Sequence, residues 1–446
     1  MDNEEKQVVL KAIHELVEAN DFENAFPLID AVLEADPNNA PALHFLGYVY
    51  LMGGQYSFAY QAYRRALQEH PGNHALWTSL GRAAHELNRH DEAIKCFLKS
   101  AEINPEYAMA YANAAATFAK ISKWEDAEKS ARLALECDSN DLPAHLNLAH
   151  ALLAQGKWKE GWQEWGKSLG CKYRKEWVYG DETRWDGSPD KRVVIYGEQG
   201  LGDEIFYASC VPDAIEISQK VWIDCDPKLE GLFKRSFPRA EVHGTRRDES
   251  PAWLVNASIE HRCAIGGLPE FFRNDSKTFP RKPYLAADPE RRLMWRALFD
   301  SWGKKVIGIT THGGAKHTNA AGRKIEFDDL LPLLEKDYAF VSLDYAPDDT
   351  ELDEELNGVK IHKFPFATQS QDYDDTAALI AELDYVVGVP TTAQHCAAAI
   401  GVQTICLVPT HHQWRYGQPS MPWYRTMRLI YQGEKTWAEV IKSVDL

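Results

Sequence analysis

The sequence predicts an α-helical repeat array followed by an α/β module of two domains. Proline recurs at Pro37, Pro71 and Pro105, each 34 residues after the last, which indicates a repeated unit. After Trp165 this period stops, and short apolar strands alternate with helical stretches, as in α/β domains. The expected boundaries are 1–170 for the array, 171–191 for a linker, and 192–303 and 304–446 for the two α/β domains.

Each repeat is predicted to be a helical hairpin. Small residues such as Gly47 and Gly81 let the two helices approach, and large residues such as Tyr63 and Phe97 fill the space between hairpins. A 34-residue period with this pattern is the signature of tetratricopeptide repeats, whose units bury their apolar faces only by stacking. The expected units are a degenerate one at about residues 4–37, three more up to about residue 138, and a closing unit from Ser139 to Trp165.

The closing unit carries tryptophan at Trp158, Trp162 and Trp165. This is helical spacing, so the three indoles share one face of a helix. We expect that face to pack against the next domain, because an aromatic stripe at this spacing is more often core than a ligand site.

Two asparagines, Asn113 and Asn147, hold the same position in successive repeats. The first helix of each hairpin lines the groove of such an array, and an amide can both donate to and accept from the backbone of an extended peptide. This pair resembles the asparagine ladder of the O-GlcNAc transferases, although Phe45 and Ser79 hold the equivalent earlier positions. A peptide groove and ordinary polar surface both remain open for these two residues.

Composition narrows the function classes. The 446 residues carry a formal net charge of −17, which disfavours a nucleic-acid partner. The eight cysteines are scattered without a C-x-x-C pair, which is typical of a reducing, cytoplasmic environment. No apolar run reaches the ~18 residues of a membrane span, and the polar first residues do not resemble a secretory signal. We therefore expect a cytoplasmic protein with no transmembrane segment.

The α/β module begins with the apolar strand Arg192–Gly197, a glycine turn at Gly200 and Gly202, and a helix over Glu204–Ile217. A strand, a glycine turn and a helix start form the first unit of a doubly wound sheet. The long helix that links the two domains is predicted over Leu285–Trp302. Further strands are predicted at Val221–Cys225, Ala252–Asn256, Lys305–Thr310, Tyr338–Leu343, Tyr385–Gly388 and Thr404–Val408.

Asp203 directly follows the glycine turn. The carboxyl ends of the strands border the ligand crevice of an open α/β sheet, and a carboxylate there can take a proton from an acceptor hydroxyl. Aspartate is also favoured where a helix begins, as a cap. Both roles remain open, and they can coexist.

A second polar cluster opens the predicted helix Ala393–Ile400. The hydroxyls of Thr391 and Thr392 and the free N–H groups of a helix start form an anion site, and His395 lies one turn further along. A third cluster is a basic loop that follows the strand Lys305–Thr310 and suits a diphosphate leaving group, with surface charge as the alternative. Its members are Lys316, Arg323 and Lys324. The histidines lack zinc-ligand spacing, so we expect no metal.

At these residues the second half resembles the bacterial glycosyltransferases of family 9, the heptosyltransferase-like type, in the subset carried behind tetratricopeptide repeats. The matching segments are RWDGS (Arg184–Ser188), GEQGLGDEI (Gly197–Ile205), DTAALIAELDYVVGVPTTAQHCAAAIG (Asp375–Gly401), QWRYG (Gln413–Gly417) and SMPWYRTMRLIYQ (Ser420–Gln432). The resemblance implies a GT-B fold of two Rossmann-like domains, an acceptor-side domain over 192–303 and a donor domain over 304–446. The overall layout is also similar to that of the O-GlcNAc transferases.

The resemblance further implies an inverting, metal-independent hexosyl or heptosyl transfer. The donor is a nucleotide-sugar, which is a substrate and not a cofactor. The acceptor is a protein or a glycan, selected partly by the array. On the matching positions, Asp203 is the base, and the donor phosphates meet the turn at Thr391, Thr392 and His395 and the basic loop.

One position departs from the family pattern. Relatives usually carry Asp-Thr at the donor turn, where this chain has Pro390 and Thr391. Proline removes a backbone donor and a carboxylate, and Thr392 offers a second hydroxyl. The alternative function is therefore a catalytically degenerate GT-B domain fused to a peptide-binding repeat adaptor.

Overall fold

The computed structural model describes residues 1–246, 248, 251–313, 321–345, 353–356 and 358–446. The chain divides into two compact units, Met1–Ala151 and Leu152–Leu446. Each unit is considered by itself below.

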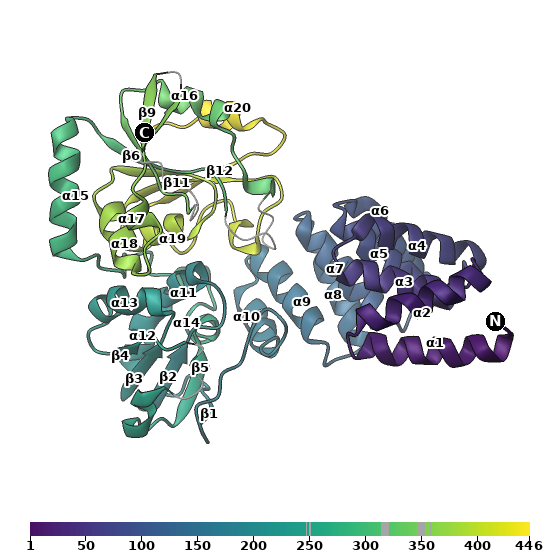
Figure 1. Cartoon of the computed structure of the whole chain (residues 1–446). Helices are drawn as coiled ribbons and strands as arrows, with labels where there is room; N and C mark the ends of the chain where they lie inside the picture. The colour runs from purple at the N-terminus through teal and green to yellow at the C-terminus, as the bar shows by residue number, and fades with distance from the viewer. Residues whose placement is uncertain (247, 249–250, 314–320, 346–352, 357) are drawn as a thin grey trace. The chain divides into compact units, whose positions relative to one another are not determined.

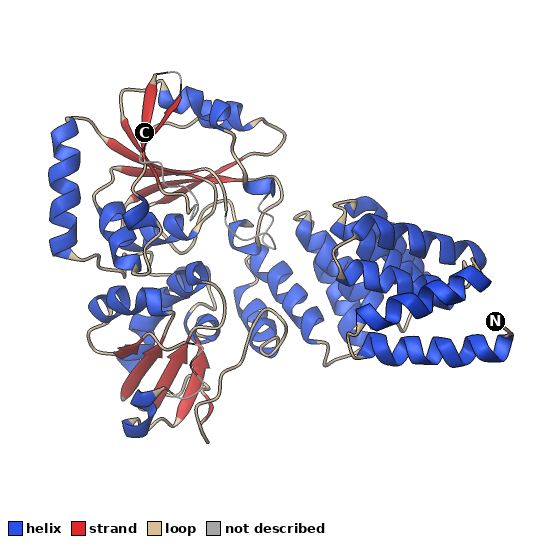
Figure 2. Ribbon diagram, in the orientation of Figure 1, coloured by secondary structure: helices blue, strands red, loops and turns tan. Residues whose placement is uncertain are grey.

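The first unit is entirely helical (Figure 2). Its helices form consecutive antiparallel hairpins that match the predicted repeats, which confirms the tetratricopeptide-like solenoid. The helices are α1 (Asn3–Glu18), α2 (Phe22–Ala35), α3 (Ala40–Met52), α4 (Tyr56–Glu69), α5 (His74–Glu86), α6 (His90–Ile103), α7 (Ala108–Lys120), α8 (Trp124–Cys137) and α9 (Leu142–Ala154), which runs three residues into the second unit.

The repeated glycines let the two helices of a hairpin touch. A β-carbon on Gly47 would lie 2.5 Å from Cε1 of Tyr63, and one on Gly81 would lie 2.5 Å from Cε1 of Phe97. Real β-carbons do not come so close to other atoms, so each glycine makes room for the aromatic ring of its own hairpin. The repeat pattern thus encodes the same close contact in the α3–α4 and α5–α6 hairpins.

The second unit contains two sheets (Figure 1). The first has the order β1-β5-β2-β3-β4 and is parallel throughout. The second has the order β12-β11-β10-β6-β7-β9-β8 and is parallel except for the β8–β9 pair. The strands are β1 (Thr183–Arg184), β2 (Arg192–Tyr196), β3 (Lys220–Asp224), β4 (Glu241–His243), β5 (His261–Ala264), β6 (Val306–Thr310), β7 (Ala339–Ser342), β8 (Asp353–Leu356), β9 (Val359–His362), β10 (Tyr385–Gly388), β11 (Gln403–Val408) and β12 (Met427–Tyr431).

Helices connect the strands and cover the sheets. The longest of them in the α/β region, α15 (Pro289–Trp302), joins the first sheet to the second (Figure 1). The others are α10 (Trp158–Lys167), α11 (Leu201–Tyr207), α12 (Val211–Ile217), α13 (Glu230–Ser236), α14 (Pro269–Phe272), α16 (Leu331–Leu334), α17 (Pro365–Thr368), α18 (Tyr373–Ala381), α19 (Thr392–Ile400) and α20 (Trp437–Lys442).

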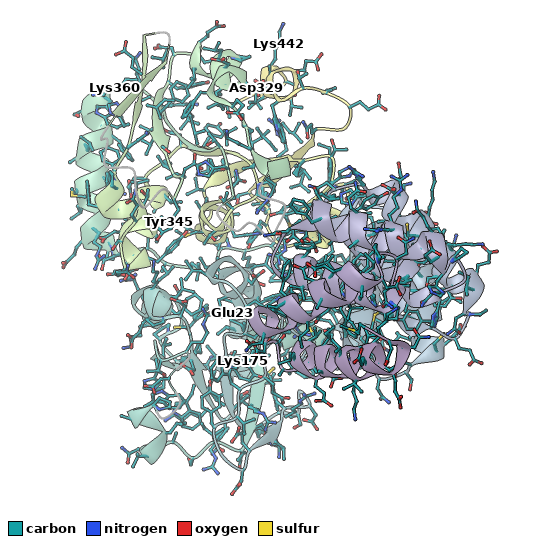
Figure 3. The ribbon with its side chains drawn as sticks, turned by 45° about the vertical axis from the view of Figure 1, so that its right-hand side comes forward. Glu23, Lys175, Asp329, Tyr345, Lys360 and Lys442 are labelled. Atoms are coloured by element: carbon teal, nitrogen blue, oxygen red, sulfur yellow. The ribbon has the colours of Figure 1, made fainter. Side chains whose placement is uncertain are left out.

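The two sheets are also tied by charge. Arg235 on α13 donates to both carboxylate oxygens of Asp374 on α18, at 2.7 and 2.9 Å, and to Asp288 at 3.1 Å. Arginine and carboxylate match in a fork geometry, which makes such a contact directional. Other charged side chains are exposed, as those of Lys360 and Lys442 are (Figure 3).

The predicted strands are present, with ends shifted by at most one residue, except for one. Residues Ala252–Asn256 form a 3₁₀ helix and not a strand. The helix predicted over Glu204–Ile217 is broken into α11 and α12 by a short 3₁₀ turn, Ala208–Cys210. Within the segment expected to be a linker, Thr183–Arg184 pairs with β5. The domain boundaries at residues 170, 191 and 303 stay predictions.

Among the residues that the structure describes, no helix combines the length and the apolar character that crossing a membrane requires.

Candidate functional site

Asp203 lies in the first turn of helix α11, which follows the carboxyl end of β2. Its Oδ2 accepts a hydrogen bond from the backbone N–H of Gly200 at 3.2 Å, so the side chain helps to cap its own helix. The N-cap position itself belongs to Gly200, and Asp203 contributes from the third position of the helix. The side chain is 28% exposed, which leaves it accessible for a second role at the surface of a site.

Arg415, from a different part of the unit, holds the other oxygen of this carboxylate. Arg415 Nη2 donates to Asp203 Oδ1 at 2.6 Å. The guanidinium is buried and lies 4.6 Å from the ring centre of Phe206 and 5.5 Å from that of Trp414. Burial by itself lowers the pKa of Arg415, but the nearby Asp203 carboxylate outweighs it and raises that pKa above the usual value.

The expected donor turn lies beside Asp203. A β-carbon on Gly202, the residue before Asp203, would be 2.8 Å from Oγ1 of Thr392. Thr391 is the N-cap of α19, and its Oγ1 accepts from the N–H of Gln394 at 3.4 Å. The glycine turn and the start of α19, predicted from separate motifs, are therefore in direct contact.

Arg323 forms a hydrogen bond to the turn that precedes α19. Its Nη1 donates to the carbonyl oxygen of Pro390 at 2.6 Å, and the residue is buried. Burial lowers the pKa of Arg323, and the positive charge of Arg415 lowers it further. Two buried guanidiniums thus lie close enough to repel each other beside the N-terminus of α19, where helix dipole and N–H groups also favour an anion.

His395 does not face the anion position. Its Nε2 lies 3.2 Å from the hydroxyl of Tyr416 and its Nδ1 lies 3.3 Å from that of Tyr424, so both ring nitrogens are engaged. Burial holds the pKa of His395 well below its usual value, and Arg415 and Arg323 add to this effect. In this arrangement the ring is a hydrogen-bonded part of the core, and the phosphate contact of His395 stays a prediction.

Lys324, another basic residue of the loop, lies at the surface. Lys324 has a 57% exposed side chain, and its Nζ lies 2.7 Å from Glu326 Oε1 in a surface ion pair. Its neighbour Arg323 is the residue that turns inward. Lys316 lies outside the described residues.

Buried ion pairs surround the glycine turn and were missed in the sequence. Arg174 Nη2 contacts Glu198 Oε1 at 2.7 Å, with both side chains buried. Arg246 pairs with Glu204 and with Asp226, the latter at 2.7 Å. Burial raises the pKa of Glu198 and of Glu204, and the arginine in each pair opposes the rise. The feature of the sequence that could have indicated these ion pairs is the number of carboxylates in the segment Gly197–Ile205.

The two groove asparagines use their amide donors within the array. Asn113 Nδ2 donates to the carbonyl of Met109 one turn earlier at 2.9 Å, and Asn147 Nδ2 donates to the carbonyl of Ala112 at 3.1 Å. Asn147 therefore joins two successive hairpins. Each amide keeps a second N–H and its Oδ1 beyond these bonds, so the peptide groove and the ordinary polar surface both stay open for the pair.

The tryptophans of α10 pack as predicted. Trp162 lies 5.6 Å from Trp414 between ring centres, and its Nε1 donates to the carbonyl of Arg273 at 3.0 Å. Trp158 contacts Phe279 and Trp423 at 5.0 and 5.8 Å. Aromatic side chains bury large areas and dominate such cores. Helix α10 is therefore an integral part of the α/β unit, directly behind the residues around Asp203.

The part of the chain that the structure describes contains no group of three histidine, cysteine, aspartate or glutamate residues arranged to hold a metal ion. The positive charges at the donor turn belong to arginine side chains.

Comparisons with known proteins agree on the repeat half. A family model described as anaphase-promoting complex, cyclosome, subunit 3 matches residues 18–100, inside the array. Protein FlbA of Caulobacter vibrioides is 29% identical over 399 residues, which cover 83% of this chain and 66% of FlbA. Superkiller complex protein 3 of Mus musculus is 26% identical over 159 residues, 35% of this chain and 10% of that protein. The chain thus spans less than two thirds of either relative.

The solved structures that resemble the chain match a little over a third of it. A crystal structure of MamA is 21% identical, with a TM-score of 0.32, and the match covers 34% of this chain and 90% of that one. YrrB, described as a TPR protein with an unusual peptide-binding site, is 20% identical, with a TM-score of 0.32, over 37% of this chain and 84% of that one. This chain is accordingly a tetratricopeptide-type repeat protein, similar to FlbA, with a parallel-sheet α/β unit after its repeats.

Proposed function

We propose that the α/β unit is an inverting, metal-independent glycosyltransferase of GT-B type that uses a nucleotide-sugar. The observation that carries this proposal is the contact between Gly202 and Thr392. It brings a partly exposed carboxylate, Asp203, next to a helix N-terminus flanked by two buried arginines. A base and an anion site side by side are what sugar transfer from a diphosphate requires.

In the proposed reaction an acceptor hydroxyl oxygen attacks the anomeric carbon of the donor sugar. The bond from that carbon to the diphosphate oxygen breaks, and its electron pair stays on the diphosphate. The proton of the hydroxyl passes to the carboxylate of Asp203. Attack from the face opposite the leaving group inverts the configuration at the sugar.

The leaving diphosphate gains charge as this bond breaks, so it needs directed donors and positive potential. The N–H groups that open α19 and the hydroxyl of Thr392 supply the donors. Arg323 and Arg415 supply the potential without a metal ion. Pro390 lacks an N–H, but its carbonyl oxygen is held by Arg323, which fixes the turn.

The array is proposed to select the acceptor, which is a protein or a protein-borne glycan. Tetratricopeptide repeats are suited to binding protein segments along their groove. Asn113 and Asn147 each use one N–H within the array and keep a second N–H and Oδ1 for such a segment. The acceptor site on the α/β unit itself would lie at Asp203.

Calorimetry of the full chain with UDP, GDP, ADP and CDP tests the donor site. We expect one of these to bind, and the Asp203→Asn variant to keep binding it while sugar transfer or sugar-nucleotide hydrolysis falls by about 10²–10⁴-fold, the usual worth of a general base. The matched control is Glu216→Gln, an exposed carboxylate in a surface pair with Arg239, which should behave like the native chain.

Absence of binding to all four nucleotides would contradict the transferase and leave the repeat adaptor as the better account. Equal turnover in the native chain and in Asp203→Asn would remove Asp203 from the mechanism even if a nucleotide binds.

A further inference from the structure

The bond between Arg415 and Asp203 points to how this site is controlled. As the structure stands, Asp203 has one oxygen on the Gly200 N–H and the other on Arg415 at 2.6 Å. Each oxygen of the carboxylate therefore already accepts one hydrogen bond, and the guanidinium holds one of the two acceptor positions of Oδ1. The proposed base is in place but bound to a neighbour.

Arg415 in turn requires an anion. A buried guanidinium without a counter-charge is strongly unfavourable, and Asp203 supplies that charge here. The arginine is not saturated by this bond, because its Nε is buried and has no hydrogen-bond partner. A planar guanidinium offers N–H groups on two edges, which match the oxygens of a phosphate.

A diphosphate at the start of α19 would bring at least two negative charges close to Arg415. It would meet the same guanidinium that Asp203 holds, together with Arg323 beneath Pro390. The carboxylate has a single charge and is 28% exposed, so water can replace Arg415 as its partner. An anion of higher charge therefore competes well for Arg415.

We propose that Arg415 is exchanged between Asp203 and the diphosphate of the donor. Before the donor binds, Arg415 holds Asp203; when the diphosphate arrives, Nη2 leaves Oδ1 and the carboxylate becomes free to accept the proton of the acceptor hydroxyl. Donor binding thus precedes and enables base catalysis. Arg415 acts on the base as a positioning residue. The role of this exchange in catalysis rests on the proposed function. The exchange itself is a competition between the Asp203 carboxylate and a diphosphate for Arg415.

Titration of the full chain with inorganic pyrophosphate, followed by calorimetry, tests this competition. Removing the competing charge with Asp203→Asn should tighten pyrophosphate binding by on the order of tenfold, the worth of a charge-assisted hydrogen bond. The control Glu216→Gln removes a carboxylate that is far from Arg415 in the chain and exposed, and it should change the affinity by less than about twofold.

A double-mutant cycle separates exchange from simple long-range repulsion. In an Arg415→Gln background, or in Arg415→Met if the first variant does not fold, the gain from Asp203→Asn should disappear. A gain of equal size with and without Arg415 would show that Asp203 acts only through space and would overturn the exchange. So would an Asp203→Asn variant that binds pyrophosphate no better than the native chain, or neither variant binding it at all.

These outcomes are distinct from failure of the proposed function. If a nucleotide-sugar is turned over but Asp203→Asn leaves pyrophosphate affinity unchanged, the transferase stands and the exchange is wrong. If no nucleoside diphosphate binds but the cycle shows coupling, the exchange stands at an anion site of another purpose.

Discussion

Gly202 and Thr392 touch: a β-carbon on the first would lie 2.8 Å from the hydroxyl oxygen of the second and 3.5 Å from its Cα. Helix α11 follows strand β2 of the first sheet, and helix α19 follows strand β10 of the second. The two helices are in contact at Gly202. The distance from the proposed base to the proposed anion site is therefore set by the absence of one side chain.

Gly202→Ala should push the two helices apart. We expect a loss of about 1–3 kcal/mol in the free energy of unfolding of the α/β unit, as for other overpacked contacts, and weaker nucleotide binding. Denaturant unfolding and calorimetry measure the two effects. Gly267→Ala is the matched control, because its β-carbon would find its nearest neighbour at an ordinary 3.5 Å. Adding Thr392→Ala removes the obstructing oxygen and should restore stability; a double variant as unstable as Gly202→Ala would argue against this contact.

Adjacent basic residues should differ sharply in their effect on donor binding. Arg323 is buried against Pro390, so Arg323→Ala should cost about 2–4 kcal/mol of nucleotide binding or transition-state stabilisation. Lys324 is exposed and paired with Glu326, so Lys324→Ala should cost less than about 0.5 kcal/mol. Equilibrium binding and kcat/KM report both. If Lys324→Ala cost more binding free energy than Arg323→Ala, the diphosphate would lie on the outer side of the loop.

We expect the α/β unit to tolerate removal of the array before residue 139 but not the additional removal of α10. A chain that begins at residue 139 keeps Trp158, Trp162 and Trp165 and should stay soluble and bind nucleotide, while binding of a macromolecular acceptor weakens. A chain that begins at residue 171 removes these indoles from Trp414 and Trp423 and should aggregate, because it exposes a large apolar surface. Size-exclusion chromatography and calorimetry decide. Equal solubility of both chains would show that α10 is dispensable.

The array should lose stability in mild acid through His85. Burial lowers the pKa of His85 to about 4, with smaller contributions from His90 and Lys120, whereas the unfolded chain has a pKa near 6.5. Because the folded form binds the proton less readily, stability is complete above about pH 6.5 and is lost as the pH falls toward 4. The loss at pH 5 should be about 1–2 kcal/mol.

His85→Gln, which keeps a side-chain donor for Thr117, should be free of this acid loss. Hydrogen exchange of the amides in α5 and α7, compared between the variant and the native chain at pH 7.5 and pH 5, measures the difference. His14→Gln, on the exposed face of another hairpin, serves as the control. A variant and a native chain that lose the same protection between the two pH values would show that His85 is not the responsible group.

Local patterns explain which parts of the fold could be predicted. The hairpins follow from a 34-residue period because small and large residues recur at fixed offsets, and in two repeats a glycine lies against an aromatic ring, as at Gly47 and Tyr63. The parallel strands follow from short apolar runs. Ala252–Asn256 has the same apolar character but forms a 3₁₀ helix, since a run of five apolar residues does not by itself distinguish a strand from a helical turn.

The site could be predicted where position along a strand was enough. Asp203 and Thr391 each follow the carboxyl end of a parallel strand, β2 in the first sheet and β10 in the second, and such ends border ligand crevices. Side-chain direction was beyond this argument. The local sequence does not indicate that the side chain of Arg323 points inward and that of Lys324 outward. It also does not indicate that His395 lies between two tyrosines. The bond from Arg415 joins it to a carboxylate 212 residues earlier, which no local pattern predicts.

That sequence separation has a consequence for how the protein is made. A ribosome adds Asp203 long before Arg415, so the carboxylate is made before its partner and before most strands of the second sheet. Chains whose synthesis stops in that interval carry the proposed base with no arginine beside it, and those that stop before Thr392 also lack the start of α19. The chemistry proposed for this molecule therefore requires synthesis at least as far as Arg415.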